Sequence, residues 1–172
     1  MSEQHTGPKP ELPTMGFAPE NPALTPWSEA EAGLVASKTY WLATTRPDGR
    51  PHVMPVWGVW LDGAFYFSTS PTSRKGKNLA ANPCCTISVS RHAIDIVVEG
   101  TAAVLTEEAT AEKVAAVYGP KYEWPVTVRD GGIYGENGDG GPLYVLTPTV
   151  AFGFGDSAAF TATRWRLARN QG

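Results

Sequence analysis

Five hydroxyl side chains lie between positions 68 and 73 of this 172-residue sequence, and three cations follow at once: Arg74, Lys75 and Lys77. The cations fall at the predicted start of a helix, where backbone N–H groups lack partners and the helix dipole is positive. Hydroxyls and cations beside such a turn hold phosphate or carboxylate groups. The pattern therefore predicts an anion site, and the alternative is an ordinary capped helix with solvated lysines.

An apolar strand upstream of this loop offers a surface for a planar heterocycle. It contains Met54, Pro55, Val56 and Trp57, and more aromatic residues follow at 65–67. Pro55 has no backbone N–H, which places the strand at a sheet edge or a bulge. Backbone groups at an edge are free to meet a ring. The competing interpretation is that these side chains simply fill the core.

Other patterns that suggest chemistry are weak, and the catalytic residues are not identified. The histidines have no metal-ligand spacing, and Cys84 and Cys85 point to opposite faces of a strand, so no metal site is predicted. Residues 153–158 match G-x-G-x-x-A, but a strand-like segment follows where a dinucleotide fold needs a helix. We expect a bend there. His52 and Tyr134 are candidate proton donors, with a structural role as the alternative for each.

The composition limits the class of protein. The length suits one domain, and a net charge of -3 argues against a broad nucleic-acid surface. No apolar stretch approaches the roughly 20 residues of a membrane span, and the first residues lack the apolar region of a secretory signal. We therefore expect a cytoplasmic protein with a small-molecule substrate and neither nucleic acid nor membrane as a partner.

The elements that must position these residues are mostly strands. Eighteen glycines and fifteen prolines favour turns and short strands, and six prolines before position 27 predict a flexible N-terminal arm, 1–26, followed by one domain, 27–172. The first helix is expected to start either at Thr25 and Pro26 or with a Ser28–Glu31 capping box. The predicted helices end near residues 37, 81 and 118, and the predicted strands are 40–44, 52–61, 64–68, 86–90, 94–105, 143–154 and 160–167. A long Gly-rich loop is expected at 120–141, and hairpin-linked strands favour an antiparallel barrel or sandwich.

Three stretches in order resemble a known superfamily. They are ATTRPDGRPHVMPVW at 43–57, FYFSTSPTSRKGKNLAANP at 65–83, and FGFG at 152–155 with TRWR at 163–166. The first two resemble the pyridoxamine 5'-phosphate oxidase-like flavin- and deazaflavin-dependent oxidoreductases. The third resembles the branch that uses the deazaflavin coenzyme F420. The resemblance covers roughly residues 38–106 and 142–167.

The resemblance implies a fold and an activity. The implied fold is mostly β: an FMN-binding split β-barrel with small helices. The implied assembly is a homodimer with cofactor sites at the interface. The implied activity is F420-dependent hydride transfer between the reduced cofactor and a small organic substrate. Two alternatives stay open, an FMN-dependent oxidase or reductase on the same fold and a non-catalytic flavin or deazaflavin carrier.

The resemblance also implies cofactor-binding residues. The ring is expected along Met54, Pro55, Val56 and Trp57. The phosphate is expected at Ser68, Thr69, Ser70, Arg74, Lys75, Lys77 and Asn78. Trp165 is expected to approach the ring from the partner subunit. Lys77 stands where the deazaflavin branch often has Arg, which keeps the charge but loses the bidentate fork. The acidic F420 tail needs further cations, and the candidates are Lys121, Arg129, Arg164 and Arg166, with solvated surface charges as the alternative.

Overall fold

The computed structural model describes residues 7–14, 22–91, 94–155 and 162–167. Within these ranges the helices are α1 (Trp27–Ala36), α2 (Arg74–Ala81) and α3 (Glu108–Tyr122). The strands are β1 (Pro10–Glu11), β2 (Tyr40–Thr45), β3 (Pro51–Val56), β4 (Gly58–Leu61), β5 (Ala64–Ser68), β6 (Cys84–Arg91), β7 (Ile94–Val104), β8 (Thr127–Arg129), β9 (Gly132–Tyr134), β10 (Gly140–Gly155) and β11 (Ala162–Arg166). None of these three helices has the length and apolar character to cross a bilayer.

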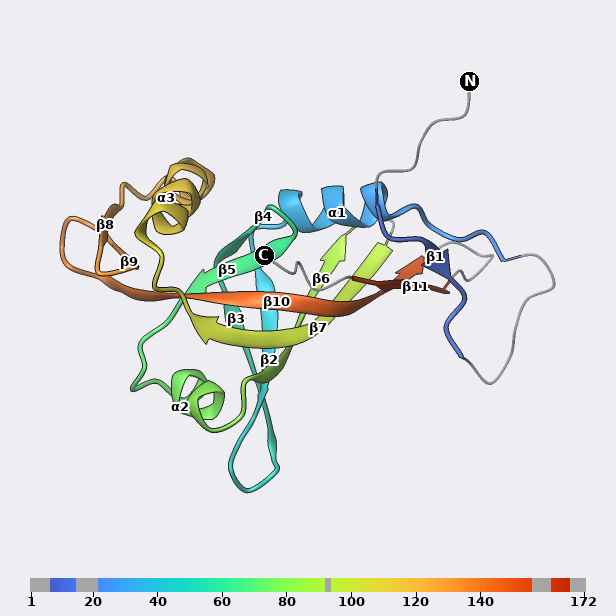
Figure 1. Ribbon diagram of the computed structural model, residues 1–172, viewed down its shortest axis with the longest axis horizontal. Coiled ribbons are helices and arrows are strands. Elements are labelled where there is room, and N and C mark those ends of the chain that lie inside the picture. The colour runs from blue at the N-terminus through green and yellow to red at the C-terminus, as the bar shows by residue number, and fades with distance from the viewer. Residues whose placement is uncertain (1–6, 15–21, 92–93, 156–161, 168–172) are drawn as a thin grey trace.

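The described strands pair antiparallel in one open sheet. Its main path is β1-β11-β10-β7-β6-β2-β3, so β3 is an edge strand, and the long β10 also pairs with β5 and β9. Figure 1 shows α3 and the β8–β9 hairpin at one end of the molecule and β1 with β11 at the other. The helix α1 lies along the sheet, and α2 lies beside the β2–β3 hairpin. The expected mostly β architecture with small helices is confirmed.

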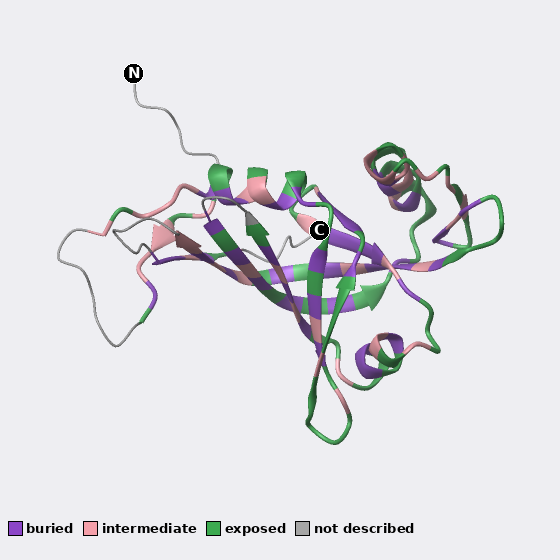
Figure 2. Cartoon of the chain, turned by 180° about the vertical axis from the view of Figure 1, so that it is seen from behind, coloured by how far each residue is buried: buried purple, intermediate pink, exposed green. Residues whose placement is uncertain are grey.

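Alternation along the strands places the core on one face of the sheet. Leu42, Ile87 and Ile96 are buried in one cluster with Leu34 and Trp27 of α1. Figure 2 shows α1 exposed on the side that faces away from the sheet. The opposite face of β2 and β3 stays exposed. Each fully buried large apolar side chain contributes about 1.5–3 kcal/mol to folding.

The predicted strand 52–61 is two strands, and this part of the prediction was wrong. β3 pairs with β2, β4 pairs with β5, and Trp57 lies between them. Gly58 explains the change of partner, because a Cβ there would lie 2.3 Å from Cζ of Phe65. Gly58 is paired with Phe67 of β5, and its N–H donates to the Tyr122 hydroxyl at 2.8 Å.

The predicted loop 120–141 is also wrong, because α3 continues to Tyr122 and a hairpin follows. Pro120 lies in the last turn of α3, where a missing N–H removes a single helix bond. β8 and β9 then form a hairpin with Asp130 (φ 51°) and Gly131 (φ 68°) at its tip. Two consecutive residues with positive φ define the turn type that an Asp-Gly pair favours.

Of the two predicted starts of α1, the one at Thr25 and Pro26 agrees with the structure to within a residue, and the Ser28–Glu31 capping box is wrong. The N-cap is Pro26, without a side-chain bond, and Glu31 instead accepts a hydrogen bond from Nε1 of Trp60 at 3.0 Å. Ahead of α1, Glu11 of β1 pairs with β11 and forms an ion pair with Arg164 at 2.9 Å. The division at residue 26 stays a prediction. Of the expected bend at 153–158, residues 153–155 belong to β10 and the rest lie outside the described residues.

Candidate functional site

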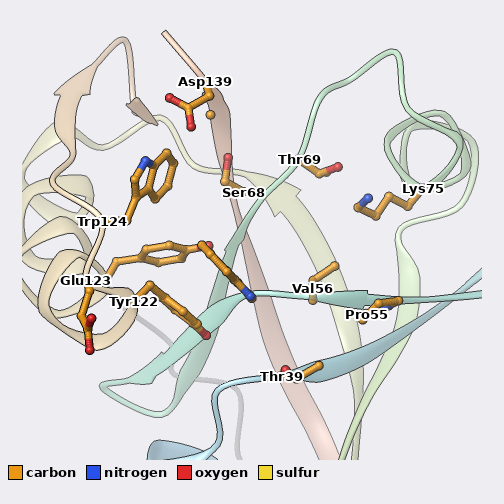
Figure 3. A pocket seen from close by; sticks show the side chains of 13 residues that line it. Thr39, Pro55, Val56, Ser68, Thr69, Lys75, Tyr122, Glu123, Trp124 and Asp139 are labelled. Carbon is orange, nitrogen blue, oxygen red and sulfur yellow. The ribbon is translucent and has the colours of Figure 1, made fainter. Parts of the chain in front are cut away.

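A cleft of about 660 Å³ lies between the sheet edge and α3 (Figure 3). One side is formed by Thr39, Pro55, Val56, Ser68, Thr69 and Lys75. The other side is formed by Trp57, Tyr118, Tyr122, Glu123, Trp124, Asp139 and Gly140. The volume lies within the range of small-molecule and cofactor sites. The cleft therefore joins the predicted loop and strand with a segment that sequence reasoning had left without a role.

The hydroxyl loop is held in shape by its own side chains. Ser73 caps α2, since its Oγ accepts from the N–H of Gly76 at 3.1 Å and donates to the carbonyl of Ser70 at 2.7 Å. Thr69 Oγ1 lies 3.1 Å from Ser73 Oγ. A Cβ on Gly76 would lie 2.4 Å from the Ser70 carbonyl oxygen, so only glycine lets the helix start pack against the loop. The loop of residues 68–73 is thus held by its own hydrogen bonds and packs against the N-terminus of α2.

The charge at this end of the cleft is positive. Lys75 is half-buried and extends toward the cleft (Figure 3). The pKa of His52 is lowered, first by its burial and then by the positive charges of Arg46, Lys75 and Arg74. The first-turn amides of α2 add a further partial positive charge. This donor set fits a phosphate group.

Other predicted phosphate residues lie around the cleft rather than in its wall. Ser70, Arg74 and Lys77 are exposed and do not line it. Asn78 is fully buried and its Nδ2 donates to Oγ1 of Thr44 at 3.0 Å, which fixes α2 to β2. Of the predicted phosphate set, Ser68, Thr69 and Lys75 line the cleft.

The predicted ring-binding strand meets the cleft through its last residues. Pro55 and Val56 of the edge strand β3 lie along one side (Figure 3), and Trp57 follows them in the lining. Met54 is exposed outside the lining. An edge position for Pro55 agrees with the prediction from its missing N–H.

Trp165 lies elsewhere. It is 0% exposed in the core, and its ring centroid lies 5.5 Å from that of Trp27. A Cβ on Gly153 would lie 2.6 Å from Cη2 of Trp165, so the glycine makes room for the indole. Trp165 is thus enclosed by its own subunit, and the structure does not bring it to the cleft.

The four cations expected to hold an acidic tail are engaged away from the cleft. Arg164 and Arg166 lie 2.9 and 3.4 Å from the Glu11 carboxylate. Arg129 lies over the Tyr134 ring, 4.3 Å from its centroid. Lys121 donates to the carbonyl of Gly58 and to Oη of Tyr40, each at 3.0 Å.

The two candidate proton donors do not line the cleft either. Nδ1 of His52 lies 3.5 Å from Oγ1 of Thr44, and Tyr134 packs under Arg129.

Sequence reasoning predicted Trp57 but missed its aromatic neighbours in the cleft, Tyr118, Tyr122 and Trp124. Trp57 stacks on Tyr122 with 4.6 Å between ring centroids, and Trp124 meets Trp57 edge-on at 6.5 Å. Burial raises the pKa of Tyr122 to about 12 and raises that of Tyr118 as well, so both phenols are protonated at neutral pH. The signal in the sequence was the i, i+4 spacing of Tyr118 and Tyr122 on a helix, with Trp124 just beyond.

An open, mostly antiparallel sheet with small helices, and a cleft between its edge strand and α3, is the architecture of a split β-barrel. The profile of the pyridoxamine 5'-phosphate oxidase family matches residues 27–139, and the chain belongs to that family. Over 74 residues the chain is 39% identical to pyridoxine/pyridoxamine 5'-phosphate oxidase from Bacteroides thetaiotaomicron. That match covers 41% of this chain and 35% of the relative, about a third of its length.

Solved structures agree with this assignment. An F420 reductase superposes with a TM-score of 0.54 at 25% identity, over 70% of this chain and 94% of its own. A pyridoxamine 5'-phosphate oxidase-related, FMN-binding protein from Nostoc punctiforme superposes with a TM-score of 0.57 at 15% identity, over 87% and 95%. The split β-barrel fold and a flavin- or deazaflavin-binding family are thereby shown. The family includes oxidases and reductases.

Proposed function

We propose that the protein is an F420-dependent oxidoreductase acting on a small organic substrate. When bound, the reduced deazaflavin supplies a hydride, and the substrate that accepts the hydride takes one proton from water. The observation behind the proposal is the cleft, which joins a phosphate-type donor set at Lys75 to an apolar sheet edge at Pro55 and Val56. The F420 reductase neighbour supports the choice of cofactor.

The residues that line the cleft bind and orient the cofactor in this proposal. Lys75 and the positive N-terminus of α2 would neutralise the phosphate, and the hydroxyls of Ser68 and Thr69 would be available to hydrogen-bond it. Pro55 and Val56 give the ring a flat apolar strand to lie on. Trp57, Tyr122 and Trp124 exclude water from the opposite side of the cleft.

FMN is the second candidate cofactor, and one observation favours it. The cations expected for the long acidic tail pair with Glu11, with Tyr134 or with backbone carbonyls instead of lining the cleft. A cleft with one phosphate end suits a cofactor with one phosphate. The protein should therefore be titrated with FMN and with F420, after purification from a host that makes no F420.

The titration is run at low and at high salt. We expect F420 to bind more tightly than FMN and to lose more affinity at high salt, because its several carboxylates are screened. Tight FMN binding with no F420 binding at either salt would replace F420 by FMN. If no acceptor is reduced by the bound, reduced cofactor, the protein is a carrier and not an enzyme.

Lys75 provides the test of the site itself. We expect Lys75→Ala to weaken cofactor binding by about 1.5–3 kcal/mol, the value of a charge-assisted hydrogen bond. Arg129→Ala is the control, since Arg129 packs on Tyr134 outside the lining. Equal affinities for wild type and Lys75→Ala would remove Lys75 from the site.

We also propose a homodimer. Trp41 pairs with Pro55 and Ala43 with Val53, which puts these apolar side chains on the outer face of β2 and β3. Trp41 and Val53 are about half exposed there. An apolar face of this kind at a sheet edge favours self-association. Sedimentation at micromolar concentration checks it, and a monomer would contradict it.

A further inference from the structure

Four aromatic side chains, Trp57, Tyr118, Tyr122 and Trp124, form a continuous aromatic wall along one side of the cleft. Tyr122 stacks on Trp57 at 4.6 Å and packs against Tyr118 at 4.8 Å between centroids. Trp124 meets both Trp57 and Tyr118 edge-on, at 6.5 and 6.0 Å. Three of the four come from α3 and the residues just after it, so this segment builds half of the site.

The aromatic wall is fixed to the sheet by backbone hydrogen bonds. Oη of Tyr122 accepts from the N–H of Gly58 at 2.8 Å and lies 2.7 Å from the carbonyl of Lys38, to which it donates. Lys121 donates to the Gly58 carbonyl at 3.0 Å from the next position of the helix. A surface held in this way is preorganised, so a ligand that stacks on it orders few side chains on binding.

The aromatic wall offers an open ring face. Trp57 is 50% exposed although Tyr122 covers one face of its indole, so the exposed half belongs to the other face and the ring edge. In Figure 3 the Trp124 indole stands across the cleft from Thr69 and Lys75. A planar aromatic group inserted between these sides would cover the exposed indole surface.

The charges at the two ends of the cleft are opposite. Lys75 lies at the hydroxyl-loop end, whereas Asp139 and Glu123 line the end with the aromatic wall. The negative pole of the α3 dipole ends there too. The Lys121 ammonium lies behind Tyr122 and makes its hydrogen bonds to backbone carbonyls and to Tyr40.

Gly135 brings an acid and an indole together at this end. A Cβ on Gly135 would lie 2.5 Å from both Oδ1 of Asp139 and Nε1 of Trp124. The carboxylate is therefore held beside the aromatic surface. Such a pairing attracts cationic rings and repels anionic ones, because ring faces and carboxylates are both negative.

We propose that the aromatic wall selects the substrate of this cleft as a planar aromatic molecule that is neutral or cationic, and that Asp139 rejects anionic ones. The proposal rests on the proposed function, since it assigns the substrate side of the same cleft. It makes Trp124 and Asp139 specificity-determining residues.

Three bicyclic probes of similar size test the charge preference: 1-methylquinolinium, 2-naphthol and 2-naphthalenesulfonate. Their binding to the full-length protein is measured by calorimetry, with and without saturating FMN or F420. We expect the cation to bind at least about fivefold more tightly than the anion, with the neutral probe between them. Equal or tighter binding of the anion would overturn the proposal.

Variants assign the effect to residues. We expect Trp124→Ala to weaken the cationic and neutral probes about tenfold, and Trp124→Phe to restore most of the affinity. Asp139→Asn should bring the cation and the anion within about twofold of each other. Glu136→Gln is the control, because Glu136 lies exposed in the same hairpin outside the lining. Unchanged probe binding in Trp124→Ala, or an unchanged charge preference in Asp139→Asn, would overturn the assignment.

Cofactor and probe are measured separately, which keeps the two proposals apart. If a cofactor binds and the probes still bind beside it, the aromatic wall is a substrate surface. If the cofactor displaces every probe, the wall holds the cofactor ring and the substrate proposal is wrong. If neither cofactor binds while the probes show the expected charge order, the proposed function fails and the aromatic site stands.

Discussion

The indole of Trp57 lies parallel to the phenol ring of Tyr122, with 9° between the planes and 4.6 Å between the centroids. Trp57 directly follows the edge strand β3, and Tyr122 ends the helix α3. The contact thus joins the strand expected to support a cofactor ring to the segment that covers it. A substitution that shifts α3 is therefore expected to displace Trp57 at the sheet edge.

Removing the Tyr122 hydroxyl tests this connection. Tyr122→Phe keeps the ring but leaves the N–H of Gly58 without its 2.8 Å acceptor. We expect a loss of about 1–3 kcal/mol in the free energy of unfolding, measured by urea denaturation. Tyr134→Phe is the matched control, since no hydrogen bond of its hydroxyl is found among the described residues. Equal stabilities for the two variants would contradict the role of Tyr122.

Gly76→Ala tests how closely the hydroxyl loop packs on α2. Alanine is the better helix former by about 1 kcal/mol, yet its Cβ would lie 2.4 Å from the Ser70 carbonyl and 2.9 Å from Cα of Pro71. We expect the clash to dominate, with lower stability and weaker cofactor binding. Gly119→Ala in α3 is the comparison, because its Cβ would come no nearer than 3.3 Å to another atom. A more stable Gly76→Ala variant would contradict the packing.

The parts of the fold that local sequence determines could be predicted. α2 follows from the Ser73 cap and the Asn82-Pro83 stop, and β5 from a run of aromatic residues between two turns. The Asp130-Gly131 turn carried a hairpin signal of the same local kind. The length and glycine content of 120–141 favour a loop and outweigh this two-residue signal.

The rest depends on contacts between distant segments. The break at Trp57 arises because Phe65, Tyr122 and Lys121 all meet Gly58. α3 continues through Pro120 because the two residues after it are held, Lys121 by Tyr40 and Tyr122 by Tyr118 and Gly58. No local pattern encodes these contacts, so residue spacing alone does not predict the side of the cleft that α3 forms. The roles given to Ser68, Thr69 and Lys75 stay predictions, although the structure places these residues in one cleft.

His52 reports on the charge of the hydroxyl-loop end. Its pKa is lowered by burial and then by the positive charges of Arg46, Lys75 and Arg74. An anion bound beside these cations offsets their charge, so we expect phosphate or FMN to raise the His52 pKa in an NMR titration. By linkage, the anion then binds more tightly as the pH falls through this range.

Riboflavin is the control ligand for His52, because it has the flavin ring without a phosphate. Lys75→Ala should raise the His52 pKa without any ligand, since one of the depressing charges is removed. A His52 pKa that does not move on addition of FMN, although FMN binds, would place the phosphate elsewhere.

Lys121 makes the stability depend on pH. Burial, and then the positive charge of Lys38, lower its pKa from 10.5 to about 8 in the folded protein. Below pH 8 the lysine is charged in both states, and burying the charge reduces stability. Between pH 8 and 10.5 the unfolded chain holds a proton that the folded protein has released, so the contribution of Lys121 to stability rises with pH.

Lys121→Met removes this dependence while keeping an unbranched side chain. Cys85, whose pKa burial raises from 9.0 to about 12, works in the opposite direction above pH 9, so the wild type alone does not isolate Lys121. The free energy of unfolding is measured in urea at pH 7 and 9.5. We expect it to rise more, or fall less, between these two pH values in the wild type than in Lys121→Met. Lys113→Met changes an exposed lysine of the same helix and should follow the wild type. Parallel pH profiles for wild type and Lys121→Met would show that Lys121 keeps its proton throughout this range.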